Sequence, residues 1–263
     1  MYIFLCEDSV DGIFTGIYDA WVSRYGHKNI KLSINEAITY ELFSEYITVT
    51  PDSEKSEKVG RTIIARLGME VYQDILQAIL AHDEKKKNEQ PDKADCIYRT
   101  LLYGFSLADG HRILQALGNP YIARVFELSR STGNEAHHLL GFLRFQELEN
   151  GVLFSTIHPK NQVISVLAEH FTDRLPQEHF MIYDATHQIA AIHKAGSGYF
   201  LTDASNLNPD VITRLSPAEK EYQKLWCGFF DSIAIEARKN PKLQSQNIPK
   251  RFWKDTVELA SGK

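Results

Sequence analysis

The chain has few cysteines and no long hydrophobic run, and both shortages exclude common classes of protein. Its three cysteines stand at positions 6, 96 and 227, and no two of them form a CxxC pair. Disulfide scaffolds, zinc ribbons and iron–sulfur clusters are therefore poorly supported, and widely spaced thiols fit a reducing cytosol. The opening MYIFLCEDSV turns acidic too early for a signal peptide, and no apolar run reaches membrane-spanning length. We expect a cytoplasmic protein with no membrane contact.

An excess of positive charge is also missing. Lys and Arg number 29 against 34 Asp and Glu, which gives a formal net charge of −5. Any contact with nucleic acid therefore requires a local basic patch. The turn that follows the apolar run Tyr2 to Cys6 lacks the glycine pattern of a dinucleotide-binding loop. A nucleotide cofactor is not indicated, and we expect none.

The stretch between His137 and Asp184 predicts a hairpin, a helix and a strand. Asn150-Gly151 lies between two apolar-rich runs, and Asn-Gly supplies the positive φ angles of a two-residue type I′ turn. Such a turn pairs Glu147 with Phe154. An amphipathic helix, a proline and an apolar strand then follow. This succession is an α+β arrangement.

The remainder of the chain extends that core. Further strands are expected at 189–193 and 199–202, which gives a largely antiparallel sheet of four to six strands with one inserted helix. Strands are also expected at Tyr2 to Cys6 and at Glu41 to Thr50. Residues 52–141 carry apolar residues at helical spacing, although 81–95 is a charged stretch expected to be exposed. The fold class is therefore α+β, with a helical N-terminal half that covers the sheet. We divide the chain into residues 1–136 and 137–263, or treat it as one continuous domain.

A long C-terminal helix is predicted to begin at Ser216. Ser216, Pro217 and Glu219 form a capping box with proline at the first helical position. The aromatic and aliphatic residues that follow recur on one face, which is expected to pack against the sheet. Glu236 projects near this face and is a candidate partner for His170 or Arg174.

His170 and Arg174 are the first candidates for chemistry. Both fall on the apolar stripe of the inserted helix and are four residues apart, so they share a surface. Polar groups on a stripe that faces an apolar interior need hydrogen-bond or ionic partners. They are either a satisfied core histidine and an arginine at the helix end, or part of a pocket with His137 and Asp184. Such a pocket supplies an acid/base imidazole, an anion-binding guanidinium and an orienting carboxylate. No metal site is expected, because no pair of ligands has a recognised spacing.

The second candidate is a basic segment near the C-terminus. Residues 238–254, RKNPKLQSQNIPKRFWK, include six Lys or Arg, two aromatic residues and no acidic residue. Cations neutralise phosphates and aromatic rings stack on unpaired bases. The predicted binding residues are Arg238, Lys242, Lys250, Arg251, Trp253 and Lys254. The alternative is an arm whose Trp253 docks on its own domain while the cations stay solvated.

Five segments are distinctive when taken together: MYIFLCEDSVDGIFTGIYDAW, GFLRFQELENGVLFSTIHPKNQV, LAEHFTDRLP, FMIYDATH and LWCGFFDSIAIEARKNPKLQSQNIPKRFWK. They resemble a bacterial family described as probable DNA metabolism proteins, a domain of unknown function. The resemblance covers nearly the whole chain. Members are typically encoded beside a DNA-modification or repair radical SAM protein, and some carry a fused uracil-DNA glycosylase domain. The resemblance implies these motif positions: His137, Arg144, His170, Phe171, Arg174, Asp184, Trp226, Arg238, Asn240, Trp253 and Glu258.

Three functions remain open from the sequence. The first is an accessory protein of DNA metabolism or repair that binds nucleic acid and works with a radical SAM enzyme. The second is an enzyme acting on nucleic acid or nucleotides, a hydrolase or a glycosylase-like enzyme, through the His/Arg/Asp pocket. The third is a protein–protein interaction module without chemistry. Whether the chain is an enzyme is left undecided.

Overall fold

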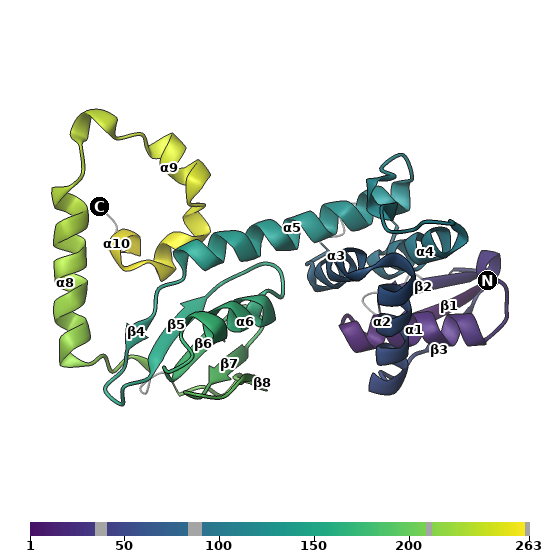
Figure 1. Cartoon of the computed structure of the whole chain (residues 1–263), viewed down its shortest axis with the longest axis horizontal. Coiled ribbons are helices and arrows are strands. Elements are labelled where there is room, and N and C mark those ends of the chain that lie inside the picture. Colours follow the sequence, from purple (N-terminus) through teal and green to yellow (C-terminus); the bar gives the residue numbers. More distant parts are fainter. Residues whose placement is uncertain (35–40, 84–90, 209–211, 261–263) are drawn as a thin grey trace. The chain divides into compact units, whose positions relative to one another are not determined.

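The structure is a computed structural model, and it describes residues 1–34, 41–83, 91–208 and 212–260. The chain forms two compact units, Met1–Gly133 and Asn134–Lys263. Figure 1 shows the elements of both units in chain order. Each unit combines helices with a sheet, which confirms the α+β prediction. Within the described residues, every helix is too short or too polar to span a membrane.

The first unit contains a parallel sheet that the sequence did not predict. Its strands are β1 (Tyr2–Cys6), β2 (Ile30–Ile34) and β3 (Glu45–Thr48), in the order β2-β1-β3. Both neighbours of β1 run parallel to it. β1 lies where a strand was predicted, and β3 lies within the predicted strand 41–50. β2 was missed, so the expectation of a mostly helical N-terminal half was incomplete.

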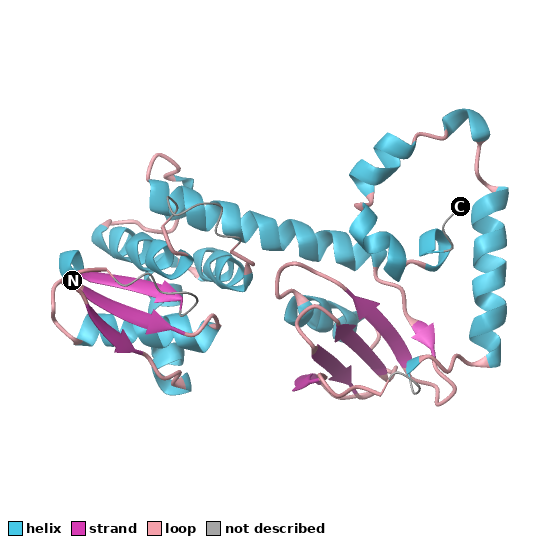
Figure 2. Ribbon diagram, turned by 180° about the vertical axis from the view of Figure 1, so that it is seen from behind, coloured by secondary structure: helices cyan, strands magenta, loops and turns pink. Residues whose placement is uncertain are grey.

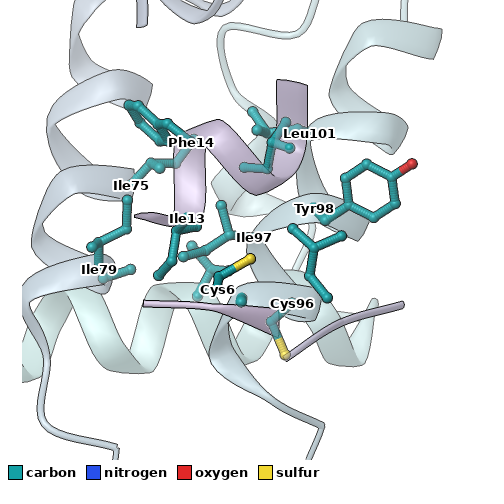
Figure 3. Packing of buried hydrophobic residues seen from close by; sticks show 14 of the residues in the cluster. Cys6, Ile13, Phe14, Ile75, Ile79, Cys96, Ile97, Tyr98 and Leu101 are labelled. Atoms are coloured by element: carbon teal, nitrogen blue, oxygen red, sulfur yellow. The ribbon is translucent and has the colours of Figure 1, made fainter. Parts of the chain in front are cut away.

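Helices pack around this sheet and build the core of the first unit. They are α1 (Val10–Val22), α2 (Ser53–Leu67), α3 (Met69–Leu80), α4 (Lys93–Ser106) and the first part of α5 (Pro120–Phe142), with the 3-10 turns η1 (His27–Asn29) and η2 (Ile113–Gln115). Figure 3 shows the apolar cluster that these helices share with β1. A Cβ on Gly16 of α1 would lie 2.2 Å from Cys6 Sγ. Glycine there lets α1 lie directly on β1.

Lys93 is fully buried in the first unit, although it lies in the stretch expected to be exposed. Its side chain is 1% exposed. The ammonium donates to the carbonyls of Ile79 at 2.8 Å and Ala81 at 2.6 Å, at the end of α3. It also forms an ion pair of 2.7 Å with Asp8, just after β1. Three acceptors therefore satisfy the buried cation, which fastens α3, α4 and β1 together.

The second unit contains a five-stranded mixed sheet with one inserted helix, which confirms the central prediction. Its strands, in order across the sheet, are β4 (Gln146–Glu147), β5 (Leu153–Ile157), β6 (Phe180–Asp184), β7 (Ile189–His193) and β8 (Tyr199–Asp203). Only the β5–β6 pair is parallel, and α6 (Ile164–Arg174) connects those two strands. Figure 2 shows α6 over one face of this sheet. The carboxyl ends of β5 and β6 therefore meet at one edge.

The hairpin register differs by one residue from the prediction. Glu147 pairs with Leu153 rather than with Phe154. The amide of Leu148 donates to the carbonyl of Val152 at 2.9 Å, which leaves three residues in the loop instead of two. Gly151 takes the positive φ of 78° that this loop needs. The Asn-Gly signal located the turn correctly but not its type.

The C-terminal part of the chain is a series of helices and turns. They are α8 (Pro217–Ser232), η3 (Glu236–Arg238), α9 (Pro241–Asn247), η4 (Lys250–Asp255) and α10 (Val257–Ala260). Ser216 caps α8 by accepting from the Glu219 amide at 3.0 Å, as predicted. The expectation that the aromatic face of α8 packs on the sheet is wrong, because α8 has no buried residue. From this part of the chain, Phe252 of η4 joins the core of the unit instead.

Candidate functional site

The basic segment, residues 238–254, folds into the short helices η3, α9 and η4. Asn240 caps α9 by accepting from the Leu243 amide at 3.0 Å, and Pro241 occupies the first turn. Figure 1 shows the chain leaving α8, passing through α9 and η4, and returning to α10. The segment is thus built of ordered turns.

Two side chains attach the second half of the basic segment to its own unit, and a third stabilises a turn within the segment. Phe252 is 1% exposed in the core. Arg251 forms an ion pair of 2.8 Å with Glu135 of α5. The indole of Trp253 donates to the carbonyl of Ile248 at 2.8 Å. Arg251 and Trp253 were both predicted to bind nucleic acid. Arg251 uses its guanidinium to attach the segment to α5, whereas Trp253 uses its indole to close a turn within the segment.

Glu135 is the centre of this attachment. Its carboxylate is 2% exposed and accepts hydrogen bonds on both oxygens. Oε1 receives the amide of Lys160 at 3.0 Å, besides Arg251. Oε2 receives the backbone amide and the side-chain amide of Asn161, both at 2.7 Å. The loop after β5, the helix α5 and the basic segment therefore meet at one buried negative charge.

The other predicted cations of the segment are free to meet a ligand. Arg238, Lys242, Lys250 and Lys254 are exposed, and none makes an ion pair with any residue that the structure describes. Lys250 lies 5.9 Å from the centre of the Trp253 ring. Glu236 pairs with Lys239 at 2.5 Å. The expected partnership of Glu236 with His170 or Arg174 is therefore wrong. Lys239, three residues further along the chain, forms the ion pair with Glu236 instead.

His158 and Asp255 form a pair that the sequence did not indicate. Nδ1 of His158 lies 2.9 and 3.1 Å from the two carboxylate oxygens of Asp255. The imidazole is 31% exposed and the carboxylate 9%. Burial raises the pKa of the Asp255 carboxyl, while the charge and hydrogen bond of His158 act to lower it. A carboxylate thus orients an imidazole whose Nε2 makes no hydrogen bond with any described residue.

Asp184, a predicted site residue, organises the turn after β6. It is fully buried. Oδ1 accepts from the amides of Thr186 at 3.0 Å and His187 at 3.1 Å, and Oδ2 accepts from His187 Nδ1 at 2.6 Å. The hydrogen bond with Asp184 raises the pKa of His187, with a further contribution from the Lys160 carbonyl, while burial opposes the shift. The pair therefore favours a charged imidazolium between the loops after β5 and β6.

An open hollow of ≈ 480 Å³ lies beside this turn. Its lining residues come from the turn after β6, from β7 and from β8: His187, Gln188, Ile189, Leu201, Thr202, Asp203 and Ser205. Because both ring nitrogens of His187 have acceptors, the imidazole presents no free lone pair to the hollow.

Among the described residues, none of the other predicted catalytic residues makes a hydrogen bond or ion pair with Asp184. His137 is exposed on α5, and His170 and Arg174 are exposed on α6. The prediction that the last two face the apolar interior is wrong. The buried residues of α6 are Ile164, Leu167, Ala168 and Phe171. His170 immediately precedes Phe171 and so points about 100° away from it.

The comparisons with known proteins identify the family. A family model for a domain of unknown function, DUF4130, matches residues 91–258. The chain belongs to this family. The DUF4130 match begins just before α4 and ends within α10, so it includes the basic segment and both His–Asp pairs. The family description names no activity.

Other comparisons add little to the DUF4130 assignment. No curated protein matches the chain. Among solved structures, the chain is similar to the DHH domain of a member of the S1p family of ribosomal proteins. That likeness has 11% identity and covers 74% of this chain and 73% of the other. The TM-score of 0.31 is too low to indicate a shared fold.

Three motif positions implied by the resemblance, Arg144, Trp226 and Glu258, interact with one another, and all three lie within the DUF4130 match. Arg144 forms an ion pair of 2.9 Å with Glu258, although the two are 114 residues apart. Burial acts to raise the pKa of Glu258, but hydrogen bonds from its own amide, Arg144 and the Trp226 indole outweigh burial and lower the pKa. These contacts attach α10 to α8 and to the chain before β4. The three residues thus have a clear structural task.

Proposed function

We propose that this DUF4130 protein binds nucleic acid through the basic segment, as an accessory protein of DNA metabolism. The observation that carries the proposal is a set of four exposed cations that make no ion pair with a described residue: Arg238, Lys242, Lys250 and Lys254. They lie in 17 consecutive residues without an acidic side chain. In a protein of net charge −5, such a cluster is a local attraction for phosphate.

Order in the segment supports this proposal further. Lys250 and Lys254 flank Arg251 and Phe252, whose side chains are anchored by Glu135 and the core. Their backbone is therefore fixed before any ligand arrives. Binding then costs less conformational entropy than ordering a disordered tail. We infer that the anchored residues, Arg251 and Phe252, fix the position of the backbone, and that the neighbouring cations, Lys250 and Lys254, contact phosphates.

Replacing Lys242, Lys250 and Lys254 with alanine is expected to weaken binding of a labelled oligonucleotide in fluorescence anisotropy. The slope of log affinity against log salt should become less steep by about 2 if three phosphate contacts to a single strand are lost. The matched control replaces three exposed lysines elsewhere, Lys58, Lys194 and Lys220. Equal slopes for the two triple variants would contradict the proposal.

The alternative of an enzyme is favoured by one specific observation, the His158–Asp255 pair. A carboxylate-oriented imidazole with a free Nε2 is the usual arrangement of a general base. Because Asp255 adjoins Lys254, phosphate bound by the basic segment would lie near this imidazole. We expect any hydrolysis of nucleic acid to depend on pH and to be lost in His158→Ala. Hydrolysis that survives this substitution would remove His158 from the chemistry.

The proposed partner is a radical SAM enzyme, and this proposal is carried by the sequence resemblance. The exposed face of α8 offers a surface for a protein partner, because Tyr222, Leu225 and Phe229 keep 66%, 67% and 54% of their area in solvent. An accessory role would combine this surface with nucleic-acid binding.

A further inference from the structure

A second surface with aromatic and basic residues lies in the Met1–Gly133 unit. We call it the Trp21 surface and define it by Trp21, Arg24, Tyr25, Lys28, Arg66 and Phe105. It combines the end of α1, the turn that follows, and the ends of α2 and α4. Trp21 is 43% exposed and Tyr25 is 40% exposed. Two large aromatic side chains within five consecutive residues therefore leave much of their area open to solvent.

The aromatic rings of the Trp21 surface are held in place by their neighbours. The ring of Tyr25 stacks on Tyr2, with centroids 3.8 Å apart and planes inclined by 11°. The ring of Trp21 lies 4.8 Å from His27 and 5.8 Å from Phe105. The rings are thus partly covered by other rings and partly open to solvent. Such fixed rings lose little entropy when a flat ligand stacks on them.

The turn that presents these rings is also fixed by hydrogen bonds. His27 Nδ1 lies 2.8 Å from the hydroxyl of Tyr98, and Arg99 donates to the His27 carbonyl at 2.8 Å. Figure 3 shows the Tyr98 hydroxyl pointing out of the apolar cluster. Asn29 donates to the Tyr25 carbonyl at 3.0 Å. The surface is therefore shaped before a ligand binds.

The charge of the Trp21 surface is positive. Residues 21–31, WVSRYGHKNIK, contain three Lys or Arg and no acidic residue. Three carboxylates of this unit have cationic partners: Asp19 with Lys55 at 2.8 Å, Glu41 with Lys31 at 2.5 Å, and Asp95 with Arg99 at 3.5 Å. Arg24, Lys28 and Arg66 make no ion pair with any residue among those described, and Arg66 lies over the Phe105 ring at 6.0 Å. Cations that make no ion pair with a described residue, placed beside open rings, complement the phosphates and bases of one ligand.

We propose that the Trp21 surface binds single-stranded nucleic acid, with unpaired bases on Trp21 and Tyr25 and phosphates on Arg24, Lys28 and Arg66. Stacking on aromatic rings requires bases released from a duplex and tolerates any sequence. Val22, beside Trp21, is 60% exposed, so the cations, and not a lack of aliphatic area, favour a polyanionic ligand over a protein partner. This site lies in the other unit from the basic segment. The two sites can therefore be tested independently.

The test measures anisotropy of a labelled mixed-sequence single strand with full-length Trp21→Ala, Tyr25→Ala and Trp21→Phe proteins. Each alanine substitution is expected to weaken binding about tenfold, and Trp21→Phe should retain most of the affinity, because a ring remains for stacking. The matched control is Phe200→Ala, which removes a 56% exposed ring from β8 in the other unit. Binding of a duplex should be unchanged by the same substitutions.

The outcomes separate this proposal from the role of the basic segment. A loss in Trp21→Ala with no loss in the Lys242, Lys250 and Lys254 triple variant supports this site and overturns the proposed function. A folded Trp21→Ala protein with unchanged affinity overturns this site alone. If that variant fails to fold, Arg24→Ala with Lys28→Ala must weaken binding and flatten the salt dependence, and no change would overturn the proposal. A shift in oligomeric state without a change in affinity would assign the surface to a second copy of the chain.

Discussion

Replacing Glu135 with alanine is expected to lower the free energy of unfolding of the C-terminal unit by about 3–5 kcal/mol. The substitution removes the acceptor of four hydrogen-bond donors, from Lys160, Asn161 and Arg251. Arg251 would keep its charge in a half-buried place without a partner, which is the costly part of breaking a buried pair. Chemical denaturation followed by tryptophan fluorescence measures this effect, since Trp226 and Trp253 lie in this unit.

The same substitution has a local consequence for the basic segment. Without Glu135, the segment keeps Phe252 as an anchor in the core, followed directly by the His158–Asp255 pair. Trypsin should then cleave faster after Lys250, Arg251 or Lys254 under native conditions. The control is Glu169→Ala, an exposed glutamate of α6. A Glu135→Ala protein as stable and as resistant as this control would contradict the anchoring described here.

Lys93→Met is expected to cause the second large loss, about 3–5 kcal/mol in the N-terminal unit. Methionine has nearly the same length and an apolar tip, so the packing volume is kept while the charge is lost. The carbonyls of Ile79 and Ala81 would remain buried without a donor, and Asp8 would lose its partner. Thermal or urea unfolding measures the change.

The control for Lys93→Met is the same substitution at an exposed position. The side chain of Lys58 is 57% exposed and 4.0 Å from Glu54. Exposed pairs of this kind contribute about 0–1 kcal/mol. If Lys93→Met and Lys58→Met have the same small effect, the buried ammonium does not fasten α3, α4 and β1.

Local patterns in the sequence predicted those parts of the fold that depend on neighbouring residues. The cap at Ser216 follows from adjacent residue types, and the strands β6, β7 and β8 follow from apolar runs between turns. β2 was missed even though Ile30, Leu32 and Ile34 alternate with polar residues. That alternation in a five-residue run was available as a signal.

The candidate site depended on pairs that no local pattern specifies. His158 and Asp255 are 97 residues apart, and Arg251 and Glu135 come from different ends of the unit. His170 and Arg174 lie on a helix, as predicted. The predicted buried stripe of that helix was too wide, because it included these two exposed residues. The aromatic face of α8 is exposed, whereas Phe252 of η4 joins the buried core of the unit. Periodicity predicts an apolar face but not which element covers it.

The most direct test of nucleic-acid binding is the affinity of the intact protein for a labelled single-stranded oligonucleotide, measured by anisotropy from low to high salt. Four exposed cations in the basic segment predict measurable binding at low salt that weakens steeply as salt rises. They also predict that the triple lysine variant binds more weakly with a smaller salt dependence. Absence of binding at low salt, or binding that does not respond to salt, would contradict the account.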